Sequence, residues 1–251
     1  MFDLTGKTAL VTGAGQNVGA GIARVLAGQG ARVLVNDLTE AQAADTVDAI
    51  VGAGGQAEAL PFDVTDLAAV GASIGTVANT AAGPIDILVN NAGNSGATGM
   101  VPTRFQDMDP ADWDAPIEVN LRGVMHCIHA ALPGMLEQGW GRLITISSGA
   151  GTVGVNIGVT PYSAGKGGAV AFMRSLALEL ASTGITANSV ALGLMNNVGS
   201  SDVTAKLAQT IPTKRLGTPE DVGHLCAYLA SEESSWMTAQ TIGLSGGSTT
   251  S

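Results

Sequence analysis

A tyrosine and a lysine four residues apart form the pattern in this sequence that is best suited to chemistry. They occur in the segment Tyr162-Ser-Ala-Gly-Lys166. Residues four apart share one face of a helix, so the phenol and the ammonium would project together. We expect the ammonium to favour phenolate and to lower the pKa of Tyr162. Such a phenol can exchange a proton with an alcohol or carbonyl oxygen during a hydride transfer.

Taken alone, this spacing is also typical of ordinary residues on a helix surface. A second polar group strengthens the case, because the strand-like run Ile144-Thr-Ile-Ser147-Ser148 precedes the helix. A serine hydroxyl at the end of that strand could hold a substrate oxygen beside Tyr162. Successive strand residues face opposite sides, so only one of the two serines would face the site.

A glycine-rich turn, Gly13-Ala-Gly15-Gln-Asn-Val-Gly19, joins the first predicted strand to the first predicted helix. Backbone N–H groups at such a helix start suit a pyrophosphate. The second strand ends at Asp37, whose carboxylate could accept both hydroxyls of an adenosine ribose and would repel a 2′-phosphate. Gln16 and Leu38 supply no cation for that phosphate, so the sequence predicts NAD rather than NADP. The alternative for Asp37 is an acid at a helix N-terminus.

The elements that position these residues alternate regularly. The patterning predicts strands at residues 8–11, 32–36, 57–60, 85–89, 142–146, 186–190 and 241–244. It predicts helices at residues 18–29, 40–52, 66–80, 110–137, 162–182 and 219–230, with a weak one near 202–209. This order is typical of one α/β domain, residues 1–251, with a doubly wound parallel sheet flanked by helices on both faces. Asp63 and Val64 would close the third strand, and Asn90 to Gly93 the fourth, although Asn and Gly are also ordinary turn formers.

Composition excludes several classes of function. The net charge is −10 and the 11 Lys and Arg residues are scattered, which argues against nucleic acid as a partner. No charged leader with an apolar run and no long apolar window is present, so we expect a soluble protein without a membrane span. Cys127 and Cys226 are too few and too far apart for a disulfide framework or metal site, and we expect buried thiols, no metal and a cytoplasmic location.

In combination, these motifs resemble the short-chain dehydrogenase/reductase family over essentially the whole chain, and its 3-oxoacyl carrier-protein reductase-like branch in particular. The resemblance implies a Rossmann fold with seven parallel strands and a catalytic tetrad of Asn120, Ser148, Tyr162 and Lys166. Tyr162 would be the general acid/base, Lys166 would hold the nicotinamide ribose, Ser148 would orient the substrate oxygen, and Asn120 would hold a water of the proton relay. The implied cofactor residues are Gly13, Gln16, Asn17, Val18, Gly19, Asp37, Asp63, Val64, Asn90, Ala92, Gly93, Tyr162, Lys166, Gly193, Met195 and Asn197.

The sequence departs from the family pattern at three places near the cofactor. Asn17 stands where the middle glycine of the turn is usual, and Asn tolerates positive φ better than most residues. Leu192 replaces the proline that usually precedes Gly193. Asn197 replaces a threonine that bonds the nicotinamide amide, so the details of carboxamide binding should differ.

The substrate is the part that the sequence defines least. Residues 193–216 are polar and poorly periodic, and we interpret them as a substrate lid, with an ordinary surface loop as the alternative. Apolar residues at this edge, which suit a largely apolar substrate or only pack the lid, are Met100, Val101, Leu194, Met195 and Val198. We expect NAD-linked exchange of hydride with a secondary alcohol or ketone, with an NADP-dependent 3-oxoacyl reductase and a silent NAD-binding sensor or scaffold as alternatives. The resemblance also implies a homotetramer.

Overall fold

The protein is built on one seven-stranded parallel sheet. The computed structural model describes residues 1–78, 83–93, 101–196 and 201–250. The strands lie in the order β3-β2-β1-β4-β5-β6-β7, and every neighbouring pair is parallel. Their bounds are β1 Thr8–Val11, β2 Arg32–Val35, β3 Gln56–Ala59, β4 Ile87–Asn90, β5 Gly141–Ser148, β6 Ile185–Leu192 and β7 Thr241–Leu244. The prediction of seven strands is confirmed, with ends that shift by one or two residues.

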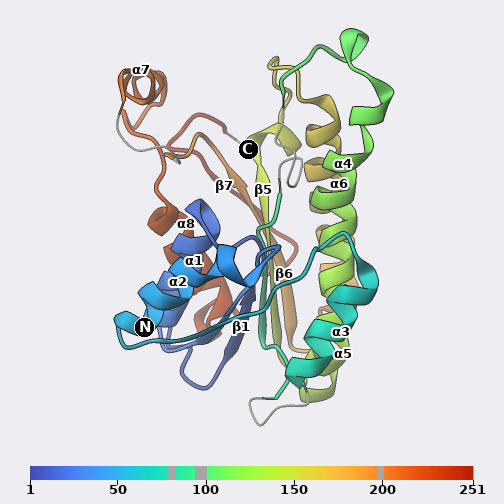
Figure 1. Ribbon diagram of the computed structural model, residues 1–251, viewed down its shortest axis with the longest axis vertical. Coiled ribbons are helices and arrows are strands. Elements are labelled where there is room, and N and C mark those ends of the chain that lie inside the picture. The colour runs from blue at the N-terminus through green and yellow to red at the C-terminus, as the bar shows by residue number, and fades with distance from the viewer. Residues whose placement is uncertain (79–82, 94–100, 197–200, 251) are drawn as a thin grey trace.

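Helices cover both faces of the sheet, as predicted (Figure 1). One face carries α1 (Asn17–Gly28), α2 (Glu40–Gly52) and α8 (Pro219–Ala230). The other carries α3 (Leu67–Ala78), α5 (Gly123–Gln138) and α6 (Thr160–Leu180). This is the doubly wound Rossmann arrangement, and the chain changes direction between β1 and β4, where such folds bind their ligands.

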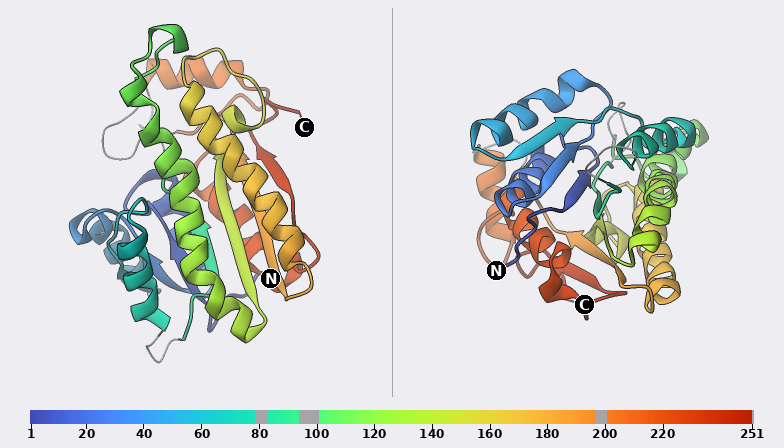
Figure 2. Two further views of the ribbon diagram at one scale, coloured as in Figure 1. Left: turned by 90° about the vertical axis from the view of Figure 1, so that its right-hand side faces the viewer. Right: turned by 90° about the horizontal axis from the view of Figure 1, so that it is seen from below.

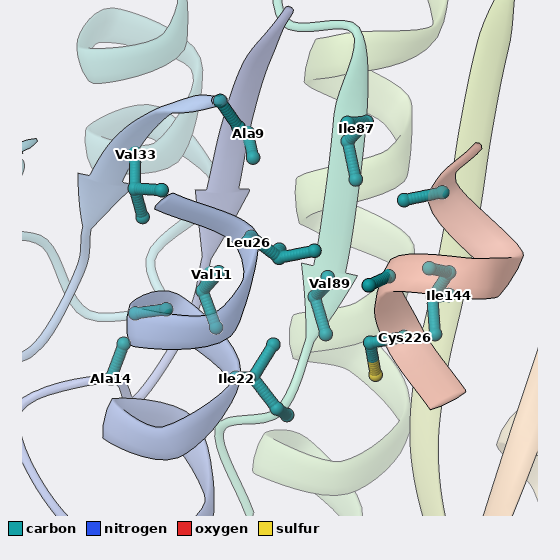
Figure 3. Packing of buried hydrophobic residues seen from close by; sticks show 14 of the residues in the cluster. Ala9, Val11, Ala14, Ile22, Leu26, Val33, Ile87, Val89, Ile144 and Cys226 are labelled. Atoms are coloured by element: carbon teal, nitrogen blue, oxygen red, sulfur yellow. The ribbon is translucent and has the colours of Figure 1, made fainter. Parts of the chain in front are cut away.

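The core has two layers because each central strand is buried on both faces. Val11 and Val89 point toward α1 and α8, where they meet Ile22 and Cys226 (Figure 3). Leu10 and Leu88 belong to the opposite layer, with residues of α5 and α6. Each fully buried side chain of this kind contributes about 1.5–3 kcal/mol, so the strands that carry the site are firmly held.

The prediction of one regular helix over residues 110–137 is wrong. The chain forms a short 3₁₀ turn at Pro110–Asp112, then α4 (Asp114–Ile117), a π-helical turn at Glu118–Arg122, and only then α5. Asn120 lies in the π turn, fully buried, and its amide donates to the Pro116 carbonyl at 2.7 Å. Figure 2 shows these segments running beside α6. Single-turn π segments are frequent at functional sites, since they re-aim one side chain.

Neither a membrane span nor a metal cluster is found within the described residues. Their helices lack the length and apolar character needed to cross a bilayer. They also contain no group of three or more side chains placed to hold a metal ion.

Candidate active site

The glycine-rich turn between β1 and α1 lies at the carboxyl edge of the sheet. Gly13 has a φ of +59°, and a Cβ atom there would lie 2.9 Å from the Ala92 Cα. The turn therefore packs tightly against the segment that follows β4. Gln16 precedes α1 in extended conformation and makes no side-chain cap, whereas Thr39 and Thr218 cap α2 and α8. Backbone N–H groups at the start of α1 thus have no capping side chain in front of them.

Asn17 occupies the left-handed region, with a φ of +50°. The prediction that asparagine tolerates this turn is confirmed by the backbone. The left-handed conformation destabilises a residue that has a Cβ atom by about 1 kcal/mol or more, and it destabilises glycine little.

We expect Asn17→Gly to keep or slightly raise the free energy of unfolding and Asn17→Ala to lower it by about 1 kcal/mol. Urea unfolding of both variants measures the difference. Equal stability of the alanine and glycine variants would show that the turn is not strained.

Asp37 follows β2 and faces the glycine-rich turn. Its carboxylate accepts the Gly15 N–H at 3.0 Å and the Leu38 N–H at 2.9 Å. The cap of α2 is Thr39, so Asp37 does not serve as the helix N-terminal acid. The carboxylate is thereby fixed in orientation beside the turn.

The prediction that Asp63 and Val64 close the third strand is wrong. β3 ends at Ala59, and Asp63 lies four residues farther on, where its carboxylate accepts the backbone N–H and the hydroxyl of Thr65 at 2.8 Å each. Val64 is buried against Gly123, and its carbonyl lies 2.9 Å from His126 Nδ1. Contacts with α5, rather than strand pairing, hold this segment at the edge.

Thr12 and Asn91, which were not predicted as site residues, tie the segment after β4 to the turn. Thr12 Oγ1 accepts the N–H groups of Asn91 and Ala92 at 3.0 and 3.1 Å. The Asn91 amide donates to the carbonyls of Thr12 and Gly13 at 2.9 Å each. Asn90 ends β4 and is buried. Short polar residues at two adjoining strand ends were the only signal in the sequence.

Gly93 brings two of the predicted catalytic side chains together. A Cβ atom on Gly93 would lie 3.0 Å from both Asn120 Oδ1 and Lys166 Nζ. Any larger residue at position 93 would press on both groups. The π turn before α5 and the first turns of α6 therefore meet at this glycine.

Lys166 is buried and anchored to the sheet. Its Nζ donates to the Ile146 carbonyl at 2.7 Å and lies 5.9 Å from the centre of the Tyr162 ring. Ser147 donates to the backbone carbonyl of Lys166 at 3.3 Å, while Ser148 interacts with the Tyr162 hydroxyl. The two serines thus have different partners, and Ser148 is the one beside Tyr162.

The expected effect of Lys166 on Tyr162 is wrong for this structure. Burial raises the pKa of the Tyr162 phenol, and hydrogen bonding to Ser148 lowers it in part. Lys166 is not among the groups that lower this pKa, and its ammonium donates to the Ile146 carbonyl. Burial also lowers the pKa of Lys166 to about 8.

The buried lysine makes stability depend on pH. The pKa of Lys166 is about 8 in the folded protein and 10.5 in its ordinary state, so between pH 8 and 10.5 this side chain is protonated in the unfolded chain but not in the folded one. The buried charge therefore destabilises the protein most below about pH 8, and the free energy of unfolding rises with pH toward 10.5. Measured by urea unfolding near pH 7 and near pH 10, the parent should gain about 2–3 kcal/mol relative to Lys166→Met. Parallel pH profiles for the two proteins would contradict this.

The segment after β6 forms the other wall of this edge. Met195 pairs with Gly217 through a short parallel bridge, and α7 (Asp202–Thr210) projects beyond the sheet (Figure 1). Val203 and Leu207 on α7 are exposed. Gly193 and Met195 lie at the base of this segment, whereas the predicted cofactor residue Asn197, together with Met100 and Val198, falls outside the described residues.

The two cysteines play no part in this site. Cys127 and Cys226 are free and buried, and burial raises the pKa of each thiol to about 12. The prediction of inert core thiols is confirmed.

Comparison with known proteins identifies the family. Residues 13–249 match the family model described as "Enoyl-(Acyl carrier protein) reductase". The chain is 38% identical to oxidoreductase UcpA of Salmonella typhimurium, covering 99% of this chain and 97% of the relative. It is 36% identical to the 3-oxoacyl-[acyl-carrier-protein] reductase FabG of Vibrio harveyi, covering 98% of both chains.

A solved structure shows the same architecture. A gluconate 5-dehydrogenase from Burkholderia cenocepacia, crystallised with NADP and tartrate, superposes with a TM-score of 0.89 at 32% identity, covering 98% of this chain and 96% of that one. The chain therefore belongs to the short-chain dehydrogenase/reductase family and is an oxidoreductase that acts on CH–OH groups with a nicotinamide cofactor.

Proposed function

We propose that the protein uses NAD to exchange a hydride with a secondary alcohol or ketone. The observation that carries the choice of NAD is Asp37, whose carboxylate is fixed by Gly15 and Leu38 N–H groups at the end of β2. A carboxylate at this place can accept two ribose hydroxyls but repels a 2′-phosphate. Position 38 is leucine, which offers that phosphate no charge.

The residues around the turn fit a dinucleotide. The uncapped start of α1, at Asn17 to Gly19, would hold the pyrophosphate through backbone N–H groups. Asp63 and Val64 would lie along the adenine, and Ala92 and Gly93 along the middle of the cofactor. Gly193 and Met195, together with Asn197, would hold the nicotinamide end.

The side chains beside Gly93 support a proton relay. When bound, the nicotinamide supplies or accepts the hydride. Tyr162 Oη would give its proton to a carbonyl oxygen or take one from an alcohol, with Ser148 orienting that oxygen. A raised pKa keeps the Tyr162 phenol protonated near neutral pH, which suits reduction, so oxidation should speed up as pH rises. Lys166 would hold the nicotinamide ribose, and Asn120 would hold a water of the proton relay.

The rim of the site supports an apolar substrate. Exposed apolar side chains follow β5 at Val153, Val155 and Ile157, and further ones follow β6 at Leu194 and on α7. Loops after these strands lie at the carboxyl edge of the sheet, where Tyr162 and Ser148 also lie. We propose that residues 193–216 act as a lid that lays apolar groups over the substrate.

An NADP-dependent 3-oxoacyl reductase is the second candidate, because the Vibrio harveyi relative is named as a carrier-protein reductase. Acyl carrier proteins are acidic, and a chain with a net charge of −10 repels them on average. Asp37 also disfavours NADP. We therefore prefer the NAD-linked alcohol or ketone reaction.

A screen of secondary alcohols and ketones with both cofactors tests the proposal. We expect turnover with NAD or NADH and at least one apolar substrate, and little with the phosphorylated cofactors. Tight NAD binding without turnover on a broad panel would favour a silent NAD-binding module instead. Preference for NADPH and a 3-oxoacyl thioester would favour the second candidate.

We also propose a homotetramer that uses α5 and α6. Exposed Met125 and Leu136 on α5, and Leu178 on α6, leave apolar groups on the outer side of these two adjacent helices. Figure 2 shows the two helices side by side on one face of the molecule. Exposed apolar groups of this kind are suited to burial between subunits.

A further inference from the structure

One buried amide connects three of the segments that surround the proposed adenosine site. Asn36 is the residue after β2 and is 1% exposed, so its side chain does not face solvent. Its amide nitrogen donates to the carbonyls of Leu60 and Phe62 at 3.0 Å each. Its amide oxygen accepts the Gly13 N–H at 3.3 Å.

The orientation of this amide follows from its neighbours. Three carbonyl oxygens, those of Asp37, Leu60 and Phe62, surround the nitrogen, and one N–H group faces the oxygen. The opposite orientation would place an oxygen against three carbonyls. Only an amide offers two donors and an acceptor at this size, and an isosteric carboxylate would offer no donor.

Backbone bonds complete the connection. The Asn36 carbonyl accepts the Ala14 N–H at 2.7 Å, its N–H donates to Val11 at 3.0 Å, and the Asp37 carbonyl accepts the Phe62 N–H at 3.1 Å. The glycine-rich turn, Asp37 and the segment that leads to Asp63 are therefore held by one residue. Leu60 to Phe62 lie beyond the end of β3 at Ala59. Two backbone bonds still pair them with the end of β2 and the residues after it, from Leu60 N–H to the Val35 carbonyl at 3.0 Å and from Phe62 N–H to the Asp37 carbonyl.

We propose that Asn36 is a positioning residue for the adenosine half of the cofactor. It sets the Asp37 carboxylate, the Gly13 turn and the Leu60–Phe62 carbonyls relative to one another without touching the ligand. This inference rests on the proposed NAD site. Loss of the amide would leave the Leu60 and Phe62 carbonyls without their donor and loosen the adenine-side loop, so affinity falls while the nicotinamide end keeps its geometry.

Binding of ADP, which carries only the adenosine half, tests this directly by calorimetry. We expect Asn36→Ala to weaken ADP about 5- to 20-fold. The KM for NAD should rise by a similar factor with kcat unchanged at saturation. Asn36→Asp should bind ADP no more tightly than Asn36→Ala, because the carboxylate fills the same space but cannot donate a hydrogen bond. Full recovery in the aspartate variant would reduce Asn36 to a packing role.

Asn188 is the matched control. It is also 1% exposed, and its amide joins β6 to the chain before β7 through Met237 at 2.7 Å and Gln240 at 3.0 Å. Asn188→Ala should lower stability without changing ADP affinity.

The outcomes separate the two proposals. Equal ADP affinity in the parent and Asn36→Ala, or an equal loss in Asn188→Ala, would overturn the role of Asn36 alone. A parent that binds neither ADP nor NAD would overturn the proposed function and this role with it. If the alanine variant does not fold, the aspartate variant carries the same comparison, with unchanged affinity as the contrary result.

Discussion

Replacing Tyr162 by phenylalanine should lower kcat about 100- to 10,000-fold, the range for loss of a general acid/base. The phenylalanine ring keeps the packing near Lys166, and Ser148 loses only its partner hydroxyl. The start of α1 and Asp37 do not change, so NAD affinity should stay within about twofold, since no cofactor contact of the adenosine half is removed. Steady-state rates and a fluorescence titration of NAD measure the two quantities separately.

The chain offers a matched control, because Tyr228 is its other tyrosine. Tyr228 lies in α8 and packs edge-on against Phe2, with ring centres 5.5 Å apart. Tyr228→Phe should leave kcat unchanged. If Tyr162→Phe retained parental turnover, Tyr162 could not be the group that moves the proton.

Removing the charge of Asp37 should change cofactor choice by about 10- to 100-fold, the value of one or two hydrogen bonds to a charged group. Asp37→Asn keeps an oxygen for the Gly15 N–H, so the turn should hold its shape. NAD should bind more weakly and NADP relatively better, because the repulsion of a 2′-phosphate is gone. The ratio of kcat/KM for the two cofactors measures the effect.

Asp45→Asn provides the control for net charge. Asp45 lies exposed on α2, and its replacement removes one carboxylate away from the turn. The cofactor ratio should then equal that of the parent. A parent protein with equal kcat/KM for NAD and NADP would contradict the role given to Asp37.

Much of the fold could be predicted because local signals and burial agree. The bounds of α2 and α8 match the prediction, and each begins with a threonine cap, Thr39 or Thr218. Buried parallel strands are short apolar runs followed by glycine or asparagine, as at Arg32–Val35, which Asn36 follows. These signals depend only on residues close in sequence.

The rest depends on contacts between distant segments. A π turn at Glu118–Arg122 has the same apolar periodicity as a regular helix, so the sequence predicted one helix where two are separated. The i, i+4 spacing of Tyr162 and Lys166 predicted that both lie on one helix face, but the Lys166 ammonium donates its hydrogen bond to the Ile146 carbonyl. Asn36 was not predicted as a site residue, because its hydrogen-bond partners come from two other loops. The lid, the tetramer and the cytoplasmic location stay predictions.

Transfer of deuterium from a secondary alcohol labelled at its carbinol carbon tests the central claim most directly. The protein is incubated with NAD and an alcohol that the screen identifies, and the reduced cofactor is analysed by mass spectrometry. We predict one deuterium per NADH in the parent, and labelled NADH that forms about 100- to 10,000-fold more slowly with Tyr162→Phe. NADH that forms without deuterium, or NAD that binds and is never reduced by any alcohol of the panel, would contradict hydride exchange at this site.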